Sequence, residues 1–237
     1  MEETVELRAA IENLYTTFAA YPLRDDTNAC ACCHSPEDEK RLHRKSLRKM
    51  NPNDLRLYAT DALFVWGEVV DLKHFLPRIF ELVAAHGAEF VDPQVVLNKL
   101  HHADWQNWPA PELRAVDRFL DVLWSCVLEG EPHEFYGEEI GDWLCGIAQA
   151  VGQLSPYLQT WIANESENAR LNLARFIAST DFANPRRRAS AYWGERAELF
   201  DEVGAWVRSE TVKAKMTTIA AEYPQYDFVE RAYISLP

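Results

Sequence analysis

The chain has 237 residues, of which 48% are hydrophobic, and its formal net charge is −13. This composition provides a packed core and excludes a disordered chain, which needs low hydrophobicity. A strongly acidic protein repels phosphate backbones and anionic lipids, so we expect no binding to nucleic acid or to a membrane. We also expect a cytoplasmic protein, because the N-terminus lacks the basic start and apolar stretch of a secretory signal.

Hydrophobic residues recur at helical spacing along most of the chain. They stand three or four positions apart within residues 7–18, 55–63, 72–83, 113–127, 140–151 and 212–223. This spacing places them on one face of a helix, and no series of alternating runs indicates a sheet. The pattern predicts an all-α fold of about nine to eleven helices in one domain over residues 1–237. The expected architecture is either an irregular multi-helix bundle or a short stack of antiparallel helix pairs.

Local signals mark where helices begin and end. The residues with a capping side chain directly before a proline are Ser35, Asn51, Asp92 and Ser155. Such a side chain accepts a free N–H of the first turn, and proline is favoured at the first helical position. Gly87 and Gly130 follow periodic runs and are typical of helix ends. Pro77 falls inside the run over 72–83 and predicts a kink or two shorter helices. Residues 21–35 predict a longer loop.

This loop carries three of the five cysteines, Cys30, Cys32 and Cys33, followed by His34. Cys30 and Cys33 have the C-x-x-C spacing that allows two sulfurs to bind one ion. Cys32 or His34 adds a third donor, and His43 adds a fourth if its helix folds back. Because zinc prefers four nitrogen or sulfur ligands in a tetrahedron, the loop is a candidate structural zinc site.

Two other interpretations of the loop stay open. Ser35 begins a helix, and the positive end of a helix lowers the pKa of a nearby thiol such as Cys33. A redox sensor that uses Cys30 and Cys33 would have this property. The cysteines are also compatible with simple packing, because a free cysteine behaves as a small hydrophobic residue.

A second group of residues combines imidazoles and indoles at the end of a helical run. His101 and His102 end the run, and Trp105 and Trp108 follow. Histidines beside tryptophans are compatible with acid–base chemistry in a pocket. The structural interpretation is that the histidines stabilise the negative end of the helix, while the tryptophans fix the connection to the core.

Titratable side chains also cluster in residues 66–78, around Pro77. They are Glu68, Asp71, Lys73, His74 and Arg78. A kink opens a space between helices, so an enzyme with a pocket near His74 and His101 is an alternative function. The structural interpretation is a helix that begins near Asp71 and turns Phe75 inward. Farther along the chain, residues 186–188 are three arginines, which predict either an anion site or a solvated turn.

Three segments of the chain resemble a bacterial protein family. They are Tyr21-Pro22, the cysteines of residues 30–33, and Trp66-Gly67 with the string Asp71-Leu72-Lys73-His74-Phe75-Leu76-Pro77-Arg78. That family has a cysteine-rich loop after Tyr-Pro and a WG…DFKHFLPR segment, and Leu72 replaces its phenylalanine here. The resemblance covers mainly the first half of the chain. It implies that the cysteine loop belongs to the family pattern, and it implies no activity, substrate or cofactor.

The sequence as a whole predicts a non-catalytic helical binding or scaffold protein with a protein or small-molecule partner. A structural zinc ion in the region of residues 30–43 is the specific chemical hypothesis.

Overall fold

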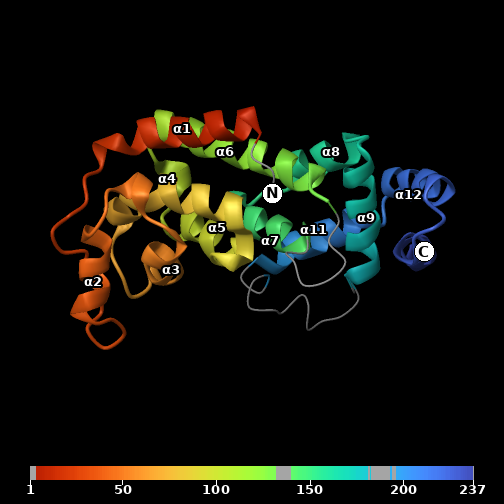
Figure 1. Ribbon diagram of the computed structural model, residues 1–237. Coiled ribbons are helices and arrows are strands. Elements are labelled where there is room, and N and C mark those ends of the chain that lie inside the picture. The colour runs from red at the N-terminus through yellow and green to blue at the C-terminus, as the bar shows by residue number, and fades with distance from the viewer. Residues whose placement is uncertain (1–3, 132–139, 181, 183–192, 194–195, 237) are drawn as a thin grey trace. The chain divides into compact units, whose positions relative to one another are not determined.

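The computed structural model describes residues 4–131, 140–180, 182, 193 and 196–236 (Figure 1). These residues form twelve α-helices, four short 3-10 helices and one isolated bridge between Ala62 and Trp66. The all-α prediction is therefore confirmed. The arginines at 186–188 lie outside the described residues. The chain divides into two compact units, 1–123 and 124–237, and the expected single domain stays a prediction.

In the first unit, α4 is the central helix, because α1, α3 and α5 all pack against it. The helices of this unit are α1 (Val5–Thr17), α2 (Pro36–His43), α3 (Pro52–Asp61), α4 (Val69–His86), α5 (Pro93–His102) and the first part of α6 (Ala110–Glu129). The 3-10 helices are η1 (Phe18–Ala20), η2 (Leu47–Lys49), η3 (Gly87–Glu89) and η4 (Trp105–Asn107). Residues 21–35 between η1 and α2 form the predicted loop.

The helix α4 continues through Pro77 as a single element. The alternative of two shorter helices is therefore wrong. A proline lacks the N–H that a helix interior uses and crowds the preceding turn. Here Pro77 is buried, and Leu76, Ile79 and Phe80 around it are at most 2% exposed, so tertiary packing holds the helix together across this position.

The predicted helix starts are correct at Ser35 and Asn51, where full capping boxes form with Asp38 and Asp54. Gly87 ends α4 with a positive φ of 48°, as glycine allows.

Two other predicted caps differ from the structure. Asp92 is the N-cap residue of α5 but makes no side-chain cap hydrogen bond. The predicted cap at Ser155 is wrong, because α8 already includes Ser155 and Leu154 is the N-cap. Leu158 N–H donates to Leu154 O at 3.0 Å, while Ser155 Oγ donates instead to Glu202 Oε1 at 3.2 Å.

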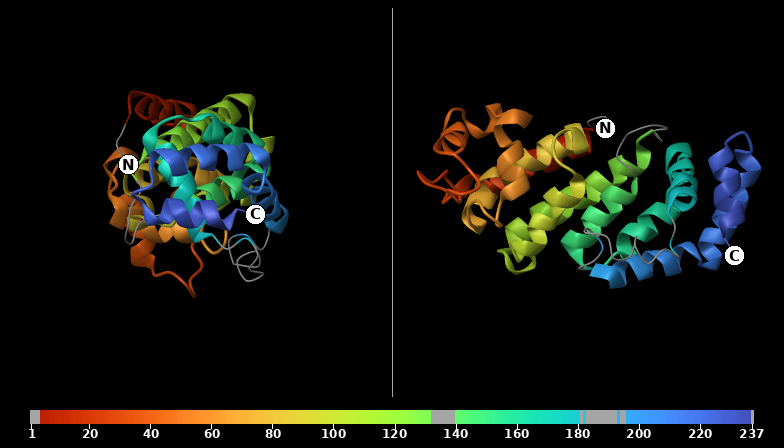
Figure 2. Two further views of the ribbon diagram at one scale, coloured as in Figure 1. Left: turned by 90° about the vertical axis from the view of Figure 1, so that its right-hand side faces the viewer. Right: turned by 90° about the horizontal axis from the view of Figure 1, so that it is seen from below.

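The second unit contains the rest of α6 and six further described helices. They are α7 (Ile140–Val151), α8 (Ser155–Ala163), α9 (Glu167–Ser179), α11 (Ala197–Val207), α12 (Glu210–Glu222) and α13 (Asp227–Ser235). The last two lie side by side, and α9 packs against both (Figure 2). Trp124 and Trp161 meet edge to face at 5.4 Å, and both indole N–H groups donate to backbone carbonyls. These aromatic contacts form a core within the unit.

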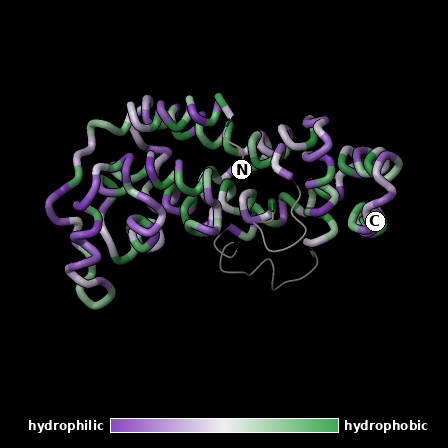
Figure 3. Tube along the Cα trace, viewed as in Figure 1, coloured by the Kyte–Doolittle hydropathy of each residue, from purple (hydrophilic) through white to green (hydrophobic). Residues whose placement is uncertain are grey.

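Hydrophobic and hydrophilic residues alternate along the helices, as an amphipathic pattern requires (Figure 3). On α6 the predicted apolar stripe is confirmed at Val116, Leu120 and Leu123, which are fully buried. The opposite face carries Arg114, Asp117, Arg118 and Asp121, which are exposed. Glu112, four positions before Val116, lies on the side of the buried stripe and is 7% exposed. Within the described residues, no helix combines the length and apolar character that crossing a lipid bilayer demands.

Candidate metal site

The candidate metal site is built on a tight turn in the loop before α2. The backbone N–H groups of Cys33 and His34 both donate to Cys30 O at 2.9 Å. A hydrogen bond from residue i+3 to residue i is typical of a β-turn, whose ends lie within about 7 Å. The turn therefore brings Cys30 and Cys33 together. The capping box of Ser35 then fixes the direction in which the chain leaves as α2.

The sulfur atoms of the three loop cysteines form one group. Cys30 Sγ lies 2.8 Å from Cys32 Sγ, which lies 3.5 Å from Cys33 Sγ. All three lie within 4.8 Å of one another, so this group can hold a metal ion. Thiolates that bind one tetrahedral zinc ion at about 2.3 Å stand about 3.8 Å apart. Small side-chain rotations would bring the three sulfurs to that spacing.

The three thiols are accessible to different degrees, and Cys30 and Cys32 differ in acidity. Cys32 and Cys33 are exposed, and Cys30 is half-buried. A hydrogen bond from Cys32 lowers the pKa of Cys30, whereas its contacts with Cys30 and Cys33 raise the pKa of Cys32 to about 11. The thiolate form is therefore favoured at Cys30 over Cys32.

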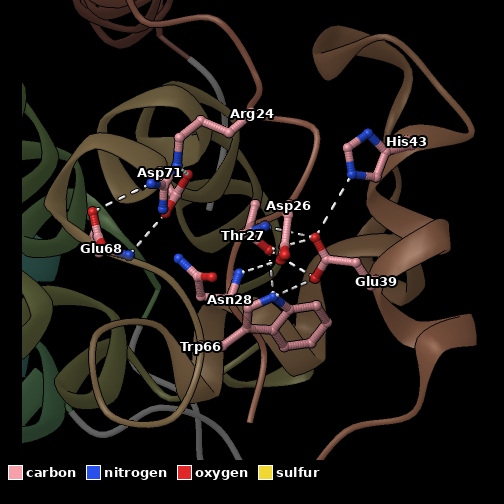
Figure 4. A network of polar contacts seen from close by, with 9 residues as sticks. All are labelled: Arg24, Asp26, Thr27, Asn28, Glu39, His43, Trp66, Glu68 and Asp71. Atoms are coloured by element: carbon pink, nitrogen blue, oxygen red, sulfur yellow. Dashed lines mark hydrogen bonds and ion pairs between the residues drawn. The ribbon is translucent and has the colours of Figure 1, made fainter. Parts of the chain in front are cut away.

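A buried polar network joins the loop to the rest of the first unit (Figure 4). The Glu39 carboxylate accepts hydrogen bonds from Thr27 N–H and Thr27 Oγ1–H, each at 2.8 Å. Trp66 Nε1–H donates to Thr27 Oγ1 at 2.7 Å and to Glu39 Oε2 at 3.0 Å. Thr27 and Trp66 are 0% and 2% exposed. The network therefore ties the loop to α2 and to the segment after α3.

A backbone contact reinforces this anchor, because Cys30 N–H donates to Val65 O at 2.9 Å. Before the turn, Asn28 takes a left-handed conformation with φ of 54°, and its N–H donates to Asp26 Oδ1. Asparagine tolerates this region better than most residues. The cysteine turn is thus held on both sides by local and long-range hydrogen bonds.

A second anchor lies at the start of α4. Arg24 forms two hydrogen bonds to the Asp71 carboxylate, at 2.7 and 2.5 Å. The same carboxylate accepts from Glu68 N–H at 2.8 Å and is 1% exposed. The interpretation of residues 66–78 as a capped helix start is therefore confirmed, and Asp71 also holds the beginning of the cysteine loop through Arg24 (Figure 4).

The two histidines predicted as metal ligands are directed to other partners. The His34 ring lies against Trp66 with 4.3 Å between ring centroids, and its Nε2 is 3.3 Å from Asp61 Oδ2. His43 Nε2 is 3.7 Å from Glu39 Oε1. Among the described residues, the atoms close enough together to bind one metal ion are the three sulfurs. A role for either histidine in metal binding stays a prediction.

His74 and His101, which marked the alternative enzyme pocket, have separate environments. His74 Nδ1–H donates to Tyr21 O at 2.7 Å, and burial lowers its pKa. His101 is exposed. A groove of about 400 Å³ occurs instead in the second unit, lined by α8, α11 and the start of α12. Neither histidine lines this groove, whose walls include Glu202 and Trp206.

Lys99 is a buried cation close to the segment that anchors the loop. The side chain is 2% exposed, and Nζ donates to Thr60 O at 2.6 Å. Nζ also lies 3.8 Å from the ring centroid of Phe64. Burial lowers the pKa of Lys99 from 10.5 to about 8, and the nearby Asp61 opposes this shift only in part.

Substitution of Lys99 by methionine is expected to change how stability depends on pH. Below about pH 8 the folded protein holds a buried charge, which costs at most about 3 kcal/mol relative to an ordinary lysine. As pH rises from about 8 to about 10.5, the folded state releases this proton before the unfolded state does, so wild type gains stability relative to Lys99→Met. Urea denaturation of both proteins at several pH values measures the difference. Lys40→Met is the control, because the Lys40 side chain is 72% exposed. The difference in stability between this variant and wild type should not change with pH.

Comparison with known proteins gives no relative for this site. No family model, no curated protein and no solved structure matches the chain.

The residues that position the loop were not found from the sequence. A buried indole needs a hydrogen-bond acceptor, so Trp66 indicated that a partner exists. Nothing local identified that partner as Thr27 or Glu39, which come from two other segments.

Proposed function

We propose that this chain is a non-catalytic helical binding or scaffold protein whose cysteine loop holds one structural zinc ion. The proposed ligands are the thiolates of Cys30, Cys32 and Cys33. His34 and His43, the further donors predicted from the sequence, face Asp61 and Glu39 instead. The partner would be a protein or a small molecule, since the net charge of −13 disfavours nucleic acid and anionic membranes.

The observation that carries this proposal is the grouping of three sulfurs within 4.8 Å on a turn with a fixed backbone. Thiolates are preferred zinc ligands, and packing in a core does not account for a cluster in which Cys32 and Cys33 are exposed. A bound ion would close the turn of residues 30–33. Zinc would then add to the stability of the loop and of the first turn of α2.

Zinc binding is expected to raise thermal stability. The purified protein should contain about one equivalent of zinc, and removal with a chelator should lower the melting temperature. At a free zinc concentration of 100 times the dissociation constant, the expected gain is about 2.7 kcal/mol. Metal analysis and thermal denaturation with and without chelator measure both quantities.

The matched control is the triple variant with serine at positions 30, 32 and 33. It should bind no zinc and should show no response to the chelator. Retention of one equivalent of zinc by this variant would contradict the proposed ligands.

A thiol redox sensor is the second candidate, favoured by the 2.8 Å approach of Cys30 Sγ to Cys32 Sγ and by the lowered pKa of Cys30. The same preparations separate the two functions. Protein that lacks zinc, and whose Cys30 reacts with iodoacetamide well below neutral pH, supports the redox sensor. Zinc that protects all three thiols from the reagent supports the structural site.

A further inference from the structure

We propose that a metal ion bound by Cys30, Cys32 and Cys33 keeps one coordination position open to solvent, and that this position binds an exogenous imidazole. The inference rests on the proposed metal site and names the ligand that completes it. It keeps the three thiolates as the protein ligands of the structural site and adds a neutral nitrogen donor from outside the chain as the fourth ligand.

The placement of His34 is the first argument. Its side chain is 4% exposed, with the ring against Trp66 and Nε2 beside Asp61. Its backbone N–H is held by Cys30 O at 2.9 Å. To reach the sulfurs, the ring would have to leave this packing and expose Trp66, which is otherwise 2% exposed. Loss of such aromatic burial is unfavourable, so His34 stays where it is.

The placement of His43 is the second argument. It lies at the last residue of α2, and its Nε2 faces Glu39 Oε1 at 3.7 Å. Glu39 in turn is held by Thr27 and Trp66, so the carboxylate beside this histidine keeps its place (Figure 4). Both histidines therefore remain with their carboxylates when the three thiolates bind a metal.

The accessible face of the cluster is the third argument. Cys32 and Cys33 are exposed, so a bound ion would have one side open to water. Three protein ligands with water in the fourth position are typical of zinc sites that exchange a ligand. The arrangement of three thiolates thus provides a position from which water can be displaced.

Charge determines which donor displaces that water. Three thiolates outweigh the two positive charges of zinc, and the whole chain is at −13. A fourth anionic ligand would add repulsion, whereas a neutral imidazole nitrogen adds a bond without adding charge. The charge balance at the site therefore favours an imidazole over a carboxylate or a further thiolate.

Cobalt provides the test, because Co²⁺ occupies zinc sites and its visible absorption reports the donors around it. The full chain is loaded with Co²⁺ and titrated with imidazole. Wild type should show thiolate-to-cobalt absorption, and imidazole should shift the visible bands in a saturable way. His34→Phe, which keeps the ring on Trp66, and His43→Ala should give the same cobalt spectrum and the same titration.

The outcomes are distinct for the two proposals. If wild type binds neither Co²⁺ nor Zn²⁺, the metal site itself is absent. If wild type binds Co²⁺ but does not respond to imidazole, or if His34→Phe or His43→Ala weakens Co²⁺ binding by about tenfold or more, the fourth ligand belongs to the protein and the inference is overturned. Far-UV circular dichroism establishes that each variant is folded.

Discussion

Substitution of Glu112 by leucine is expected to destabilise the protein by about 3 to 5 kcal/mol, because it leaves a buried lysine without its counter-charge. Lys73 Nζ lies 2.7 Å from Glu112 Oε2, and the two side chains are 10% and 9% exposed. Glu112 Oε1 also accepts from Tyr21 O–H at 2.6 Å, and Lys73 Nζ lies over the Trp108 ring at 4.3 Å. The loss should appear as a lower urea midpoint with an unchanged m-value.

The double variant Lys73→Met with Glu112→Leu tests the cause of this loss. When both charges are replaced by apolar groups of similar volume, no buried charge is left unpaired, so most of the stability should return. Glu12→Leu is the matched control, because Glu12 pairs with Arg48 at the surface, where both side chains are more than half exposed. That change should cost at most about 1 kcal/mol. Equal losses for Glu12→Leu and Glu112→Leu would show that burial of the pair is not the cause.

Glu112 also illustrates where sequence patterns fail. The helical period of α6 correctly predicted the buried residues Val116, Leu120 and Leu123, because burial on an amphipathic helix repeats every three to four positions. Glu112 precedes Val116 by four positions, so the same period places it on the buried face, where a carboxylate needs a partner. The identity of that partner depends on Lys73 in α4, and a period within one helix contains no information about a charge on another.

The metal site also has one part that the sequence predicts and one part that it does not. The grouping of Cys30, Cys32 and Cys33 could be anticipated, since they are close in sequence and a turn is a local structure. The orientations of His34 and His43 could not, because they depend on Asp61, Trp66 and Glu39. A histidine near a cysteine cluster in the sequence is therefore only a candidate ligand, and its environment in the fold determines the direction of its ring.

Substitution of Trp66 by alanine is expected to destabilise the first unit by about 3 to 5 kcal/mol and to weaken metal binding as well. The indole is 2% exposed and contacts His34 and Tyr58 at centroid distances of 4.3 and 5.6 Å. Its removal leaves a cavity and takes a donor away from Thr27 and Glu39. Because these residues hold the cysteine loop, metal affinity should fall by about 10- to 100-fold, the usual effect of removing a side chain that holds metal ligands in position. Urea denaturation and competition with a metal-binding dye measure the two effects.

Two variants separate packing from anchoring. Trp66→Phe keeps most of the ring contacts but removes the N–H donor, so it should cost about 1 to 3 kcal/mol and still lower the metal affinity. Trp161→Ala removes an equally buried tryptophan from the second unit, where its N–H donates to Ala169 O at 3.1 Å. It should cost as much stability as Trp66→Ala but leave metal affinity unchanged. A similar loss of affinity in Trp161→Ala would mean that general destabilisation, and not the Thr27–Glu39–Trp66 network, controls the loop.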